Sequence, residues 1–230
     1  MRMKLTIDLK VVIKCASFSI YHAKTIMNKG NLYIISAPSG AGKTSLVKKL
    51  VSNLDGLIVS VSHTTRQMRE GELHGKDYFF VDLETFTTMQ GEGEFLECAQ
   101  VFDNFYGTAQ QTVEMSLAQG QDVILEIDWQ GAAQVRKLIP EALSIFILPP
   151  SIEVLQQRLE KRGKDDIQTI MRRMTDATAE MSHYSEFDYL IVNDDFAVAL
   201  NALKSIVVAN RLKQMRQSAV LQSLLSNLLT

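Results

Sequence analysis

The residues best suited to chemistry lie in the segment IISAPSGAGKTSL, Ile34–Leu46. A short apolar run ends in a glycine-rich turn, and a helical pattern begins at Gly-Lys-Thr. Gly40 and Gly42 allow backbone N–H groups to face phosphate oxygens, and the helix start adds its positive dipole end. Lys43 would reach the β- and γ-phosphates of ATP, while the Thr44 hydroxyl would hold Mg²⁺. The spacing predicts a Walker A loop made of Ala37, Pro38, Ser39, Gly40, Ala41, Gly42, Lys43, Thr44 and Ser45, with Ala37 in the place of the first glycine.

A second set of residues is suited to another phosphate. Arg66 and Arg69 stand three apart in a polar segment after the second apolar run. Two guanidinium groups can bind one phosphate bidentately, and the hydroxyls of Tyr78 and Tyr106 would add to the same anion. Taken alone, two arginines in a solvated loop are the safer interpretation. Together with an ATP loop they indicate a kinase that acts on a nucleoside monophosphate.

At this point the chain resembles a known family. Guanylate kinases, which phosphorylate GMP to GDP with ATP, carry similar landmarks in the same order. The resemblance runs from about Lys29 to beyond Asp195 and rests on the segments SAPSGAGKTSL, SVSHTTR, GKDYFFV, FYGT, EIDWQGA, IFILPPS and VNDD. It is to the bacterial type rather than to the animal scaffold type.

The resemblance implies how the acceptor is recognised. Ser62, Glu97 and Thr108 should read the guanine base. Guanine offers N1–H and N2–H₂ as adjacent donors, and a carboxylate at Glu97 accepts both, whereas adenine has no such pair. The GMP phosphate should be clamped by Arg66, Arg69, Tyr78 and Tyr106. Glu72 would fix the arginines by charge pairing.

The resemblance also implies where catalysis takes place. Glu126 and Asp128 follow a buried strand, where ligands meet open parallel sheets, and should support Mg²⁺ through water or orient the arginines. Two strand-end carboxylates that simply face solvent are an equally good interpretation. Arg158, Arg162 and Arg173 match the family's flap arginines and should converge on the transferring phosphate, with Lys43, when the flap closes. ATP is the expected co-substrate and Mg²⁺ the expected cofactor.

The elements that must position these residues alternate in a regular way. Apolar runs predict buried strands at Asn31–Ala37, Gly56–Ser62, Asp122–Asp128, Ser144–Pro150 and Asp188–Asp194. Helical spacing follows the ATP loop and recurs at Trp129–Leu138, Ile152–Arg162 and Phe196–Gln217. Strands that alternate with helices predict an α/β fold with a parallel sheet covered on both faces. We expect the P-loop nucleoside monophosphate kinase fold, with a five-stranded parallel core sheet, a β-rich GMP-binding insertion and a helical lid.

The domain organisation follows from these segments. We expect an N-terminal extension over 1–28, a P-loop core over 29–61, 113–151 and 185–217, a GMP-binding insertion over 62–112, a lid over 152–184 and a C-terminal tail over 218–230. The tail, with SAVLQSLLSNLL, has helical apolar spacing that suits burial against the body or a partner subunit. Oligomeric state is left open.

Composition restricts the class of protein. The chain has 230 residues, a formal net charge of −2 and only two cysteines. No excess of basic residues favours nucleic acid, and no disulfide framework or zinc cluster is indicated. Charged residues interrupt every apolar run near the N-terminus, so neither a signal peptide nor a membrane span is predicted. We expect a cytoplasmic protein whose partners are the small molecules ATP and GMP, with dGMP use left open.

The chain departs from the family pattern in two places. Met68 and Glu70 stand where bacterial members usually have proline, which favours a looser arginine loop. The segment before Asn28 is longer than in typical members, and Met27 stands at an ordinary start. We expect residues 1–26 to be dispensable for activity, with a docked strand or an oligomer contact as the competing view.

Three other functions compete with this interpretation. A non-catalytic interaction module of the same family would lose the ATP loop, but Gly42, Lys43 and Thr44 are intact. A kinase of the same fold acting on a phosphorylated sugar would not need the guanine-reading residues. A transport ATPase is poorly supported, because no partner signature motif is evident.

Overall fold

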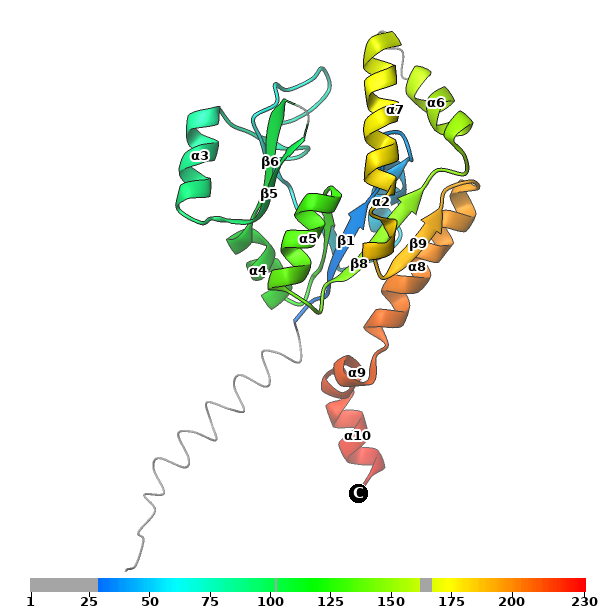
Figure 1. The fold of residues 1–230 in the computed structure, drawn as a ribbon. Coiled ribbons are helices and arrows are strands. Elements are labelled where there is room, and N and C mark those ends of the chain that lie inside the picture. Colours follow the sequence, from blue (N-terminus) through cyan, green and yellow to red (C-terminus); the bar gives the residue numbers. More distant parts are fainter. Residues whose placement is uncertain (1–28, 102, 162–166) are drawn as a thin grey trace, which may run out of the picture.

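The centre of the molecule is a five-stranded parallel β-sheet, as the sequence predicts. In this computed structural model the described residues are 29–101, 103–161 and 167–230. The strands lie side by side in the order β2-β7-β1-β8-β9 (Figure 1). Their bounds are Leu32–Ser36 for β1, Leu57–Val59 for β2, Asp122–Glu126 for β7, Leu143–Leu148 for β8 and Tyr189–Val192 for β9. Each overlaps a strand predicted from the apolar runs.

Helices cover both faces of this sheet. Alternate side chains of a strand point to opposite faces, so Tyr33 and Ile35 of β1 pack with α2 and α8, whereas Leu32 and Ile34 pack with α4 and α5. The helices are α2 (Lys43–Ser52), α4 (Gln110–Ala118), α5 (Trp129–Leu138) and α8 (Phe196–Arg211). The two apolar layers hold the carboxyl ends of β1 and β7 in place, and the predicted ATP loop follows the first of these ends.

The last strand differs from the buried strand that the sequence predicts. In β9 only Ile191 is buried, while Tyr189, Leu190 and Val192 are 41%, 48% and 52% exposed. The strand lies at the sheet edge and pairs with β8 alone. An apolar run therefore indicated the strand correctly but not its burial, which depends on its place in the sheet.

The expected insertion contains a second sheet, with strand order β4-β3-β6-β5. The strands are β3 (His63–Thr64), β4 (Phe79–Phe80), β5 (Phe95–Val101) and β6 (Asn104–Ala109), and β5 and β6 form an antiparallel pair. Against them lies a helix that the sequence analysis did not anticipate, α3 (Leu83–Gly91). The side chain of Asp82 caps α3 by accepting a bond from Thr85 N, and the ring of Phe86 packs 4.6 Å from that of Phe95. This ring contact anchors α3 to the hairpin.

Two helices form the expected lid, α6 (Ile152–Glu160) and α7 (Ile167–Met181). They pack through their own apolar cluster, made of Leu155, Leu159, Ile170 and Ala177. Ser151 caps α6 by accepting a bond from Val154 N. The predicted helix Ile152–Arg162 is confirmed as far as Glu160, and Arg162 lies outside the described residues. A short 3₁₀ turn, Tyr184–Glu186, then leads the chain back to β9.

The helix predicted over Phe196–Gln217 is confirmed as far as Arg211, but it is interrupted after that residue. The structure ends α8 at Arg211 and begins α9 (Gln214–Val220) after an extended residue, Lys213. This break lets Arg211 and Arg216 both reach the fully buried Asp122 carboxylate, at 2.7 and 2.8 Å. A buried charge must be paired, so this tertiary demand overrides the helical periodicity.

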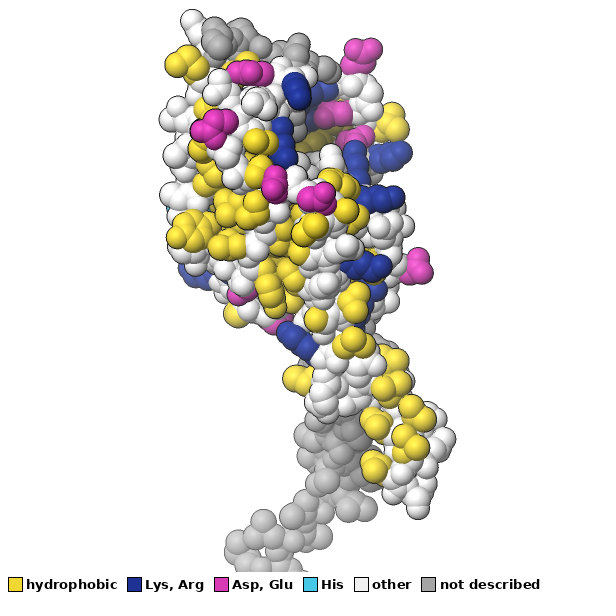
Figure 2. Space-filling view, turned by 90° about the vertical axis from the view of Figure 1, so that its right-hand side faces the viewer, with side chains coloured by type: hydrophobic (Ala, Val, Ile, Leu, Met, Phe, Trp, Pro, Cys, Tyr) yellow, Lys and Arg dark blue, Asp and Glu magenta, His cyan; other side chains and the backbone are white. Residues whose placement is uncertain are grey.

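The C-terminal tail projects from the body rather than packing on it (Figure 1). Its helix α10 (Gln222–Leu228) follows α9 directly. Apolar side chains remain exposed along both, as the space-filling view shows (Figure 2), and they include Met215, Val220, Leu224 and Leu228. The expected helical spacing is present, but burial against the body is not found in the structure.

Some sequence-based expectations fall outside the described part of the chain. Those made for residues 1–28, including Met27 and Cys15, lie there. Cys98 is described, is half-buried and forms no disulfide. Across 29–101, 103–161 and 167–230, no helix combines the length and the apolar character that crossing a membrane requires.

Candidate active site

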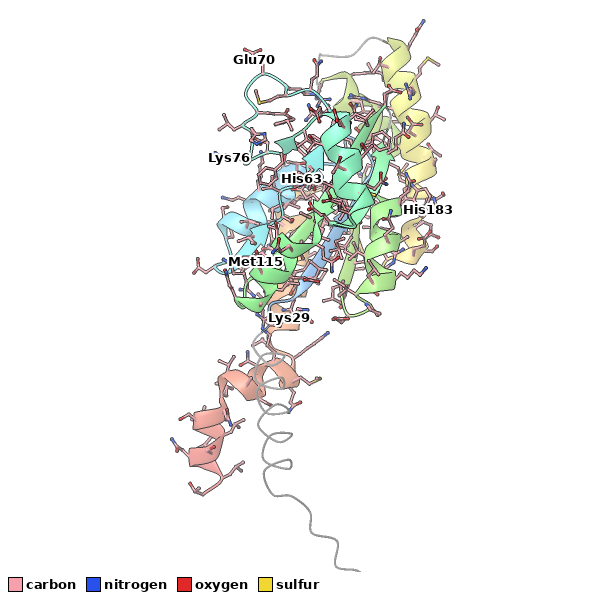
Figure 3. The ribbon with its side chains drawn as sticks, turned by 90° about the vertical axis from the view of Figure 1, so that its left-hand side faces the viewer. Lys29, His63, Glu70, Lys76, Met115 and His183 are labelled. Carbon is pink, nitrogen blue, oxygen red and sulfur yellow. The ribbon has the colours of Figure 1, made fainter. Side chains whose placement is uncertain are left out.

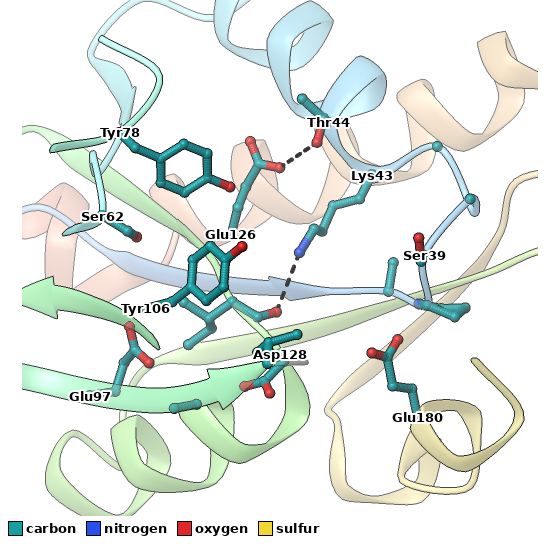
Figure 4. A pocket seen from close by; sticks show the side chains of 17 residues that line it. Ser39, Lys43, Thr44, Ser62, Tyr78, Glu97, Tyr106, Glu126, Asp128 and Glu180 are labelled. Carbon is teal, nitrogen blue, oxygen red and sulfur yellow. Dashed lines mark hydrogen bonds between the residues drawn. The ribbon is translucent and has the colours of Figure 1, made fainter. Parts of the chain in front are cut away.

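The predicted ATP loop and two of the predicted guanine-reading residues, Ser62 and Glu97, open into the same cavity, of about 270 Å³. In Figure 4 Ser62, Tyr78, Tyr106 and Glu97 lie at one end, and Ser39, Lys43 and Thr44 lie at the other. The carboxylates of Glu126 and Asp128 stand between the two ends. The cavity is lined by Ala37, Pro38, Ser39, Gly40, Gly42, Lys43, Thr44, Ser62, Tyr78, Glu97, Ala99, Val101, Tyr106, Glu126, Ile127, Asp128 and Glu180. One pocket therefore connects the predicted donor loop to the predicted base-reading residues.

The shape of the ATP loop depends on two glycines. Gly40 and Gly42 both have φ 92°, in the left-handed region that favours glycine. A Cβ at Gly42 would stand 2.4 Å from the side-chain nitrogen of Asn193. Asn193 needs that space, because its Nδ2 donates to the Ala41 carbonyl at 2.7 Å. The loop is thus held from behind by a buried amide at the end of β9.

Two side chains of the loop reach the end of β7. The Lys43 Nζ donates to the Ile127 carbonyl at 3.4 Å, and the Thr44 hydroxyl donates to the Glu126 carboxylate at 3.2 Å. A hydroxyl beside a carboxylate suits Mg²⁺, which prefers oxygen ligands. Among the described residues no group of three acidic, histidine or cysteine side chains forms a metal site. The residues present fit an ion that keeps much of its coordination shell for phosphates and water.

At the opposite end, Glu97 and Thr108 face each other across the β5–β6 pair. Both are buried, and the Thr108 hydroxyl donates to the Glu97 carboxylate at 2.5 Å. The hydroxyls of Ser62 and Thr108 lie 3.4 Å apart. Burial raises the pKa of Glu97 to about 7, with repulsion from Asp128 adding to the shift and Thr108 and Lys43 opposing it. Hydrogen-bond donors of a ligand that reach this carboxylate would offset the free-energy cost of burying its charge.

Asp128 begins α5 and lies close to the predicted base-reading end. Its carboxylate accepts a bond from Gly131 N at 2.8 Å and so caps the helix. A Cβ at Gly131 would stand 2.5 Å from Glu97 Oε2, which shows how closely α5 approaches Glu97. Asp128 and Glu97 line the same cavity, so two carboxylates are available to one ligand.

The predicted phosphate clamp is partly assembled. Arg66 forms an ion pair with Glu72 at 2.7 Å and lies over the ring of Tyr78, 5.4 Å from its centre. The rings of Tyr78 and Tyr106 lie 5.9 Å apart. Burial alone would raise the pKa of Glu72, but hydrogen bonds from Arg66 and from the Arg69 backbone lower it. Glu72 therefore stays charged and orients this loop.

Other predicted residues stand away from the cavity lining. Arg69 is exposed and donates its backbone N–H to Glu72 at 2.8 Å. Arg158 lies behind the ATP loop, where its guanidinium donates to the carbonyls of Ala41 and Asn193 at 3.4 and 2.9 Å. Arg173 is half-buried on α7. The remaining residues outside the lining are Ala41, Ser45, Glu72, Arg66 and the fully buried Thr108.

The structure adds residues that sequence reasoning did not select. Asn193 lies within the quoted segment VNDD but was given no role, although its amide holds the loop. Glu180, on α7, lines the cavity near Ser39 and Lys43 (Figure 4). Ala99, Val101 and Ile127 complete the lining. Only the folded lid brings Glu180 to a loop that lies about 140 residues earlier in the chain, so no local signal could have shown its position.

Comparison with known proteins decides the family. A family model described as guanylate kinase matches residues 29–210. The chain belongs to the guanylate kinase family. A guanylate kinase of Hahella chejuensis is 59% identical over 205 residues, covering 87% of this chain and 99% of the relative. One of Saccharophagus degradans is 60% identical over 201 residues, covering 87% and 98%.

Solved structures agree with this membership. The crystal structure of guanylate kinase from Anaplasma phagocytophilum matches with a TM-score of 0.69 and 35% identity, over 82% of this chain and 89% of the other. The sequence resemblance to guanylate kinases is thereby confirmed, and so is the predicted P-loop nucleoside monophosphate kinase fold.

Proposed function

We propose that the protein transfers the γ-phosphoryl group of ATP to GMP, producing ADP and GDP. The observation that carries this proposal is the single cavity that joins a Walker A loop to the buried Glu97–Thr108 pair. Phosphoryl transfer requires donor and acceptor to meet in line, in one water-poor space. The guanylate kinase relatives, about 58–60% identical to this chain, support the same reaction.

At the donor end, the loop binds the polyphosphate of ATP through its backbone N–H groups. Lys43 balances the negative charge that develops on the transferring group, because its ammonium points along the cavity from the start of α2. Mg²⁺, when bound, would be held by Thr44 with Glu126 or Asp128 through water, and would neutralise phosphate charge.

At the acceptor end, Glu97 accepts hydrogen bonds from N1–H and N2–H₂ of guanine. Thr108 holds the Glu97 carboxylate in position, and Ser62 extends the polar row. Asp128 lies between the two ends of the cavity, which supports a contact with the base edge beside its proposed water-mediated role with Mg²⁺. The GMP phosphate is bound by Arg66 and Arg69 together with Tyr78 and Tyr106.

The lid provides the remaining positive charge. Arg158 supports the loop from behind, and Arg173 approaches the phosphates from α7 when the lid closes over both substrates. Arg162 lies outside the described residues, and its role rests on the sequence resemblance alone. Closure also excludes water, which would otherwise hydrolyse ATP.

We retain the division of the chain as part of the proposal. The core holds the donor, the insertion holds the acceptor, and the lid closes over both. Small-molecule nucleotides are the proposed ligands, and no observation on the described residues favours a larger partner for this cavity.

Acceptor profiling tests this function. Purified protein with ATP and Mg²⁺ is supplied with GMP, dGMP, AMP, CMP or UMP in separate reactions, and nucleoside diphosphate is measured by chromatography. We expect GMP to be the preferred acceptor by at least tenfold, because only guanine offers Glu97 two adjacent donors. Equal use of AMP, or no transfer to any acceptor, would contradict the proposal. The variant Lys43→Ala serves as the inactive control.

A further inference from the structure

Glu180 has no role in the proposed mechanism, yet it lies at the donor end of the cavity. It comes from the last turn of lid helix α7 and faces Ser39 and Lys43 across the cavity (Figure 4). It also lines a neighbouring cavity of about 330 Å³ bounded by α7, α5 and β5. The carboxylate therefore stands where the lid, the ATP loop and the acceptor side meet.

The surroundings of this carboxylate resemble those of a bound phosphate. Burial raises the pKa of Glu180 to about 7, and repulsion from Asp128 and Asp176 adds to that shift. Two groups oppose this shift, the Lys43 ammonium and the Ser39 backbone, and both residues line the same cavity as Glu180. Both belong to the loop that binds the phosphates of ATP in the proposed function. The same positive groups cannot fully serve a carboxylate and a polyphosphate at once.

A neutral side chain at position 180 would not compete with a polyphosphate for Ser39 and Lys43. A buried carboxylate is unfavourable unless donors or cations stabilise it. Here the stabilising groups come from the ATP loop, while the nearest acidic neighbours repel it. An arriving polyphosphate would add more negative charge beside Glu180 and would also occupy its partners. The contact between lid and loop is thus favourable only while the donor site holds no anion.

We propose that Glu180 occupies part of the donor phosphate site in the nucleotide-free protein and is displaced when ATP binds. The inference rests on the proposed function, since it takes ATP to be the ligand of the loop. Displacement removes this contact between the Glu180 side chain and the loop, so ATP binding is coupled to the position of that side chain on α7. Such coupling lowers the apparent affinity for ATP by the free energy of the contact that is lost.

Calorimetric titration with two ligands tests this inference. ATP and inorganic tripolyphosphate are titrated into the wild type and into Glu180→Gln, which keeps the shape of the side chain and removes its charge. We expect both ligands to bind the variant about tenfold more tightly, because a competing anion has been removed. GMP affinity should change by less than about twofold, because GMP binds at the other end of the cavity.

A matched control lies one helical turn earlier. Asp176 is also on α7, but it lines only the neighbouring cavity, and its Oδ2 has no hydrogen-bond partner among the described residues. Asp176→Asn removes the same charge from the same helix and should leave ATP and tripolyphosphate affinity within about twofold of the wild type. An equal gain in ATP and tripolyphosphate affinity in both variants would overturn the inference. The gain would then come from removing any negative charge from the lid, not from Glu180 in particular.

Other outcomes separate this inference from the proposed function. Unchanged or weaker tripolyphosphate binding by Glu180→Gln would overturn the displacement of Glu180. A parallel change in GMP affinity would also overturn it, because a general structural effect would then be the cause. A wild type that binds tripolyphosphate but not ATP would contradict the proposed function, while the tripolyphosphate comparison would still decide the role of Glu180.

Discussion

The donor and acceptor ends of the cavity hold phosphate by different means. The donor loop relies on its backbone, whose shape is set by Gly42 at positive φ and by the buried Asn193 amide. The acceptor clamp relies on side chains, in which Arg66 is oriented by Glu72. Its loop is open to solvent, with Glu70 at the outer tip (Figure 3). The donor site is therefore a backbone surface of fixed shape, and the acceptor site is a set of long side chains.

This difference determines how substitutions should affect phosphate binding at each site. A backbone site depends on conformation, so a small steric change behind the loop should disturb every phosphate contact together. A side-chain site depends on separate charge pairs, so losing one partner should weaken binding without disturbing the fold. Changes at the donor end should therefore have larger effects than changes at the acceptor clamp.

The largest effect is expected from Lys43→Ala. Removing the only lysine of the donor loop takes away charge stabilisation at the transferring phosphate, and GDP formation should fall on the order of 10³-fold or more. The side chain makes one hydrogen bond, so the melting temperature should change by less than about 4 °C. A coupled ATP/GMP assay and a thermal melt measure the two quantities.

The control for this change is Lys49→Ala. Lys49 is an exposed lysine in the last turn of the same helix, and its removal should leave turnover near that of the wild type. Near-normal GDP formation by Lys43→Ala would show that the donor end does not act through this charge.

The next effect is expected from Gly42→Ala. Alanine would have to adopt the left-handed backbone conformation of Gly42, which residues with a side chain rarely take. Its Cβ would also lie 2.4 Å from the Asn193 amide nitrogen and force that amide to move. The combined free-energy cost is about 2–3 kcal/mol. We expect lower stability in chemical denaturation and weaker ATP binding. The double variant with Asn193→Ala should recover part of the loss, because the clash is removed.

Gly91 offers a matched comparison for this glycine. It ends α3 without positive φ, and a Cβ there would meet no atom within 4 Å. Gly91→Ala should be neutral or stabilising by up to about 1 kcal/mol. Equal behaviour of the two glycine variants would contradict a conformationally fixed donor loop.

Glu97→Gln should weaken base discrimination rather than phosphate binding. The amide keeps the shape but loses a charge-assisted bond worth about 1.5–3 kcal/mol, so the ratio of kcat/KM for GMP to that for AMP should fall by about 10–150-fold. An unchanged ratio would remove Glu97 from the role of reading guanine.

The pH dependence of GMP binding sharpens the same prediction. Because burial raises the pKa of Glu97 to about 7, the carboxylate gains a proton as pH falls through this value, and GMP should bind less well below it. Between the ordinary carboxyl pKa of 4.5 and about 7, the folded state holds a proton that the unfolded state has lost, so this group lowers stability as pH rises through that window. Glu97→Gln should remove both trends, which titrations with GMP and melts between pH 5 and about 8.5 would measure.

The smallest effect is expected from Glu72→Gln. Arg66 loses its ionic partner but keeps a hydrogen-bonding one, so the KM for GMP should rise by about three- to tenfold with kcat little changed. Binding of guanosine, which lacks the phosphate, should be unaffected. Glu70→Gln, at the exposed tip of the same loop, is the control and should leave the KM as it is. A matching loss in guanosine affinity would show that Glu72 supports the whole insertion.

Much of the core could be predicted from the sequence because its signals are local. The apolar runs indicated all five core strands, and Gly-Lys-Thr after such a run indicated the donor loop at its correct place. Helix α5 begins and ends at the predicted residues. Each of these depends on residues within a few positions of one another, so chain order is enough to detect it.

The tertiary structure decided which residues far apart in the sequence are in contact. It ended α8 at Arg211 so that two arginines reach Asp122, left the outer face of β9 exposed at the sheet edge, and brought Glu180 and Asn193 to the donor loop. The sequence by itself determined which segments form strands, helices and a phosphate loop, because periodicity and glycine act locally. Which charges meet, and which faces are covered, was decided only by the fold, because pairing and burial depend on what lies next to a residue in space.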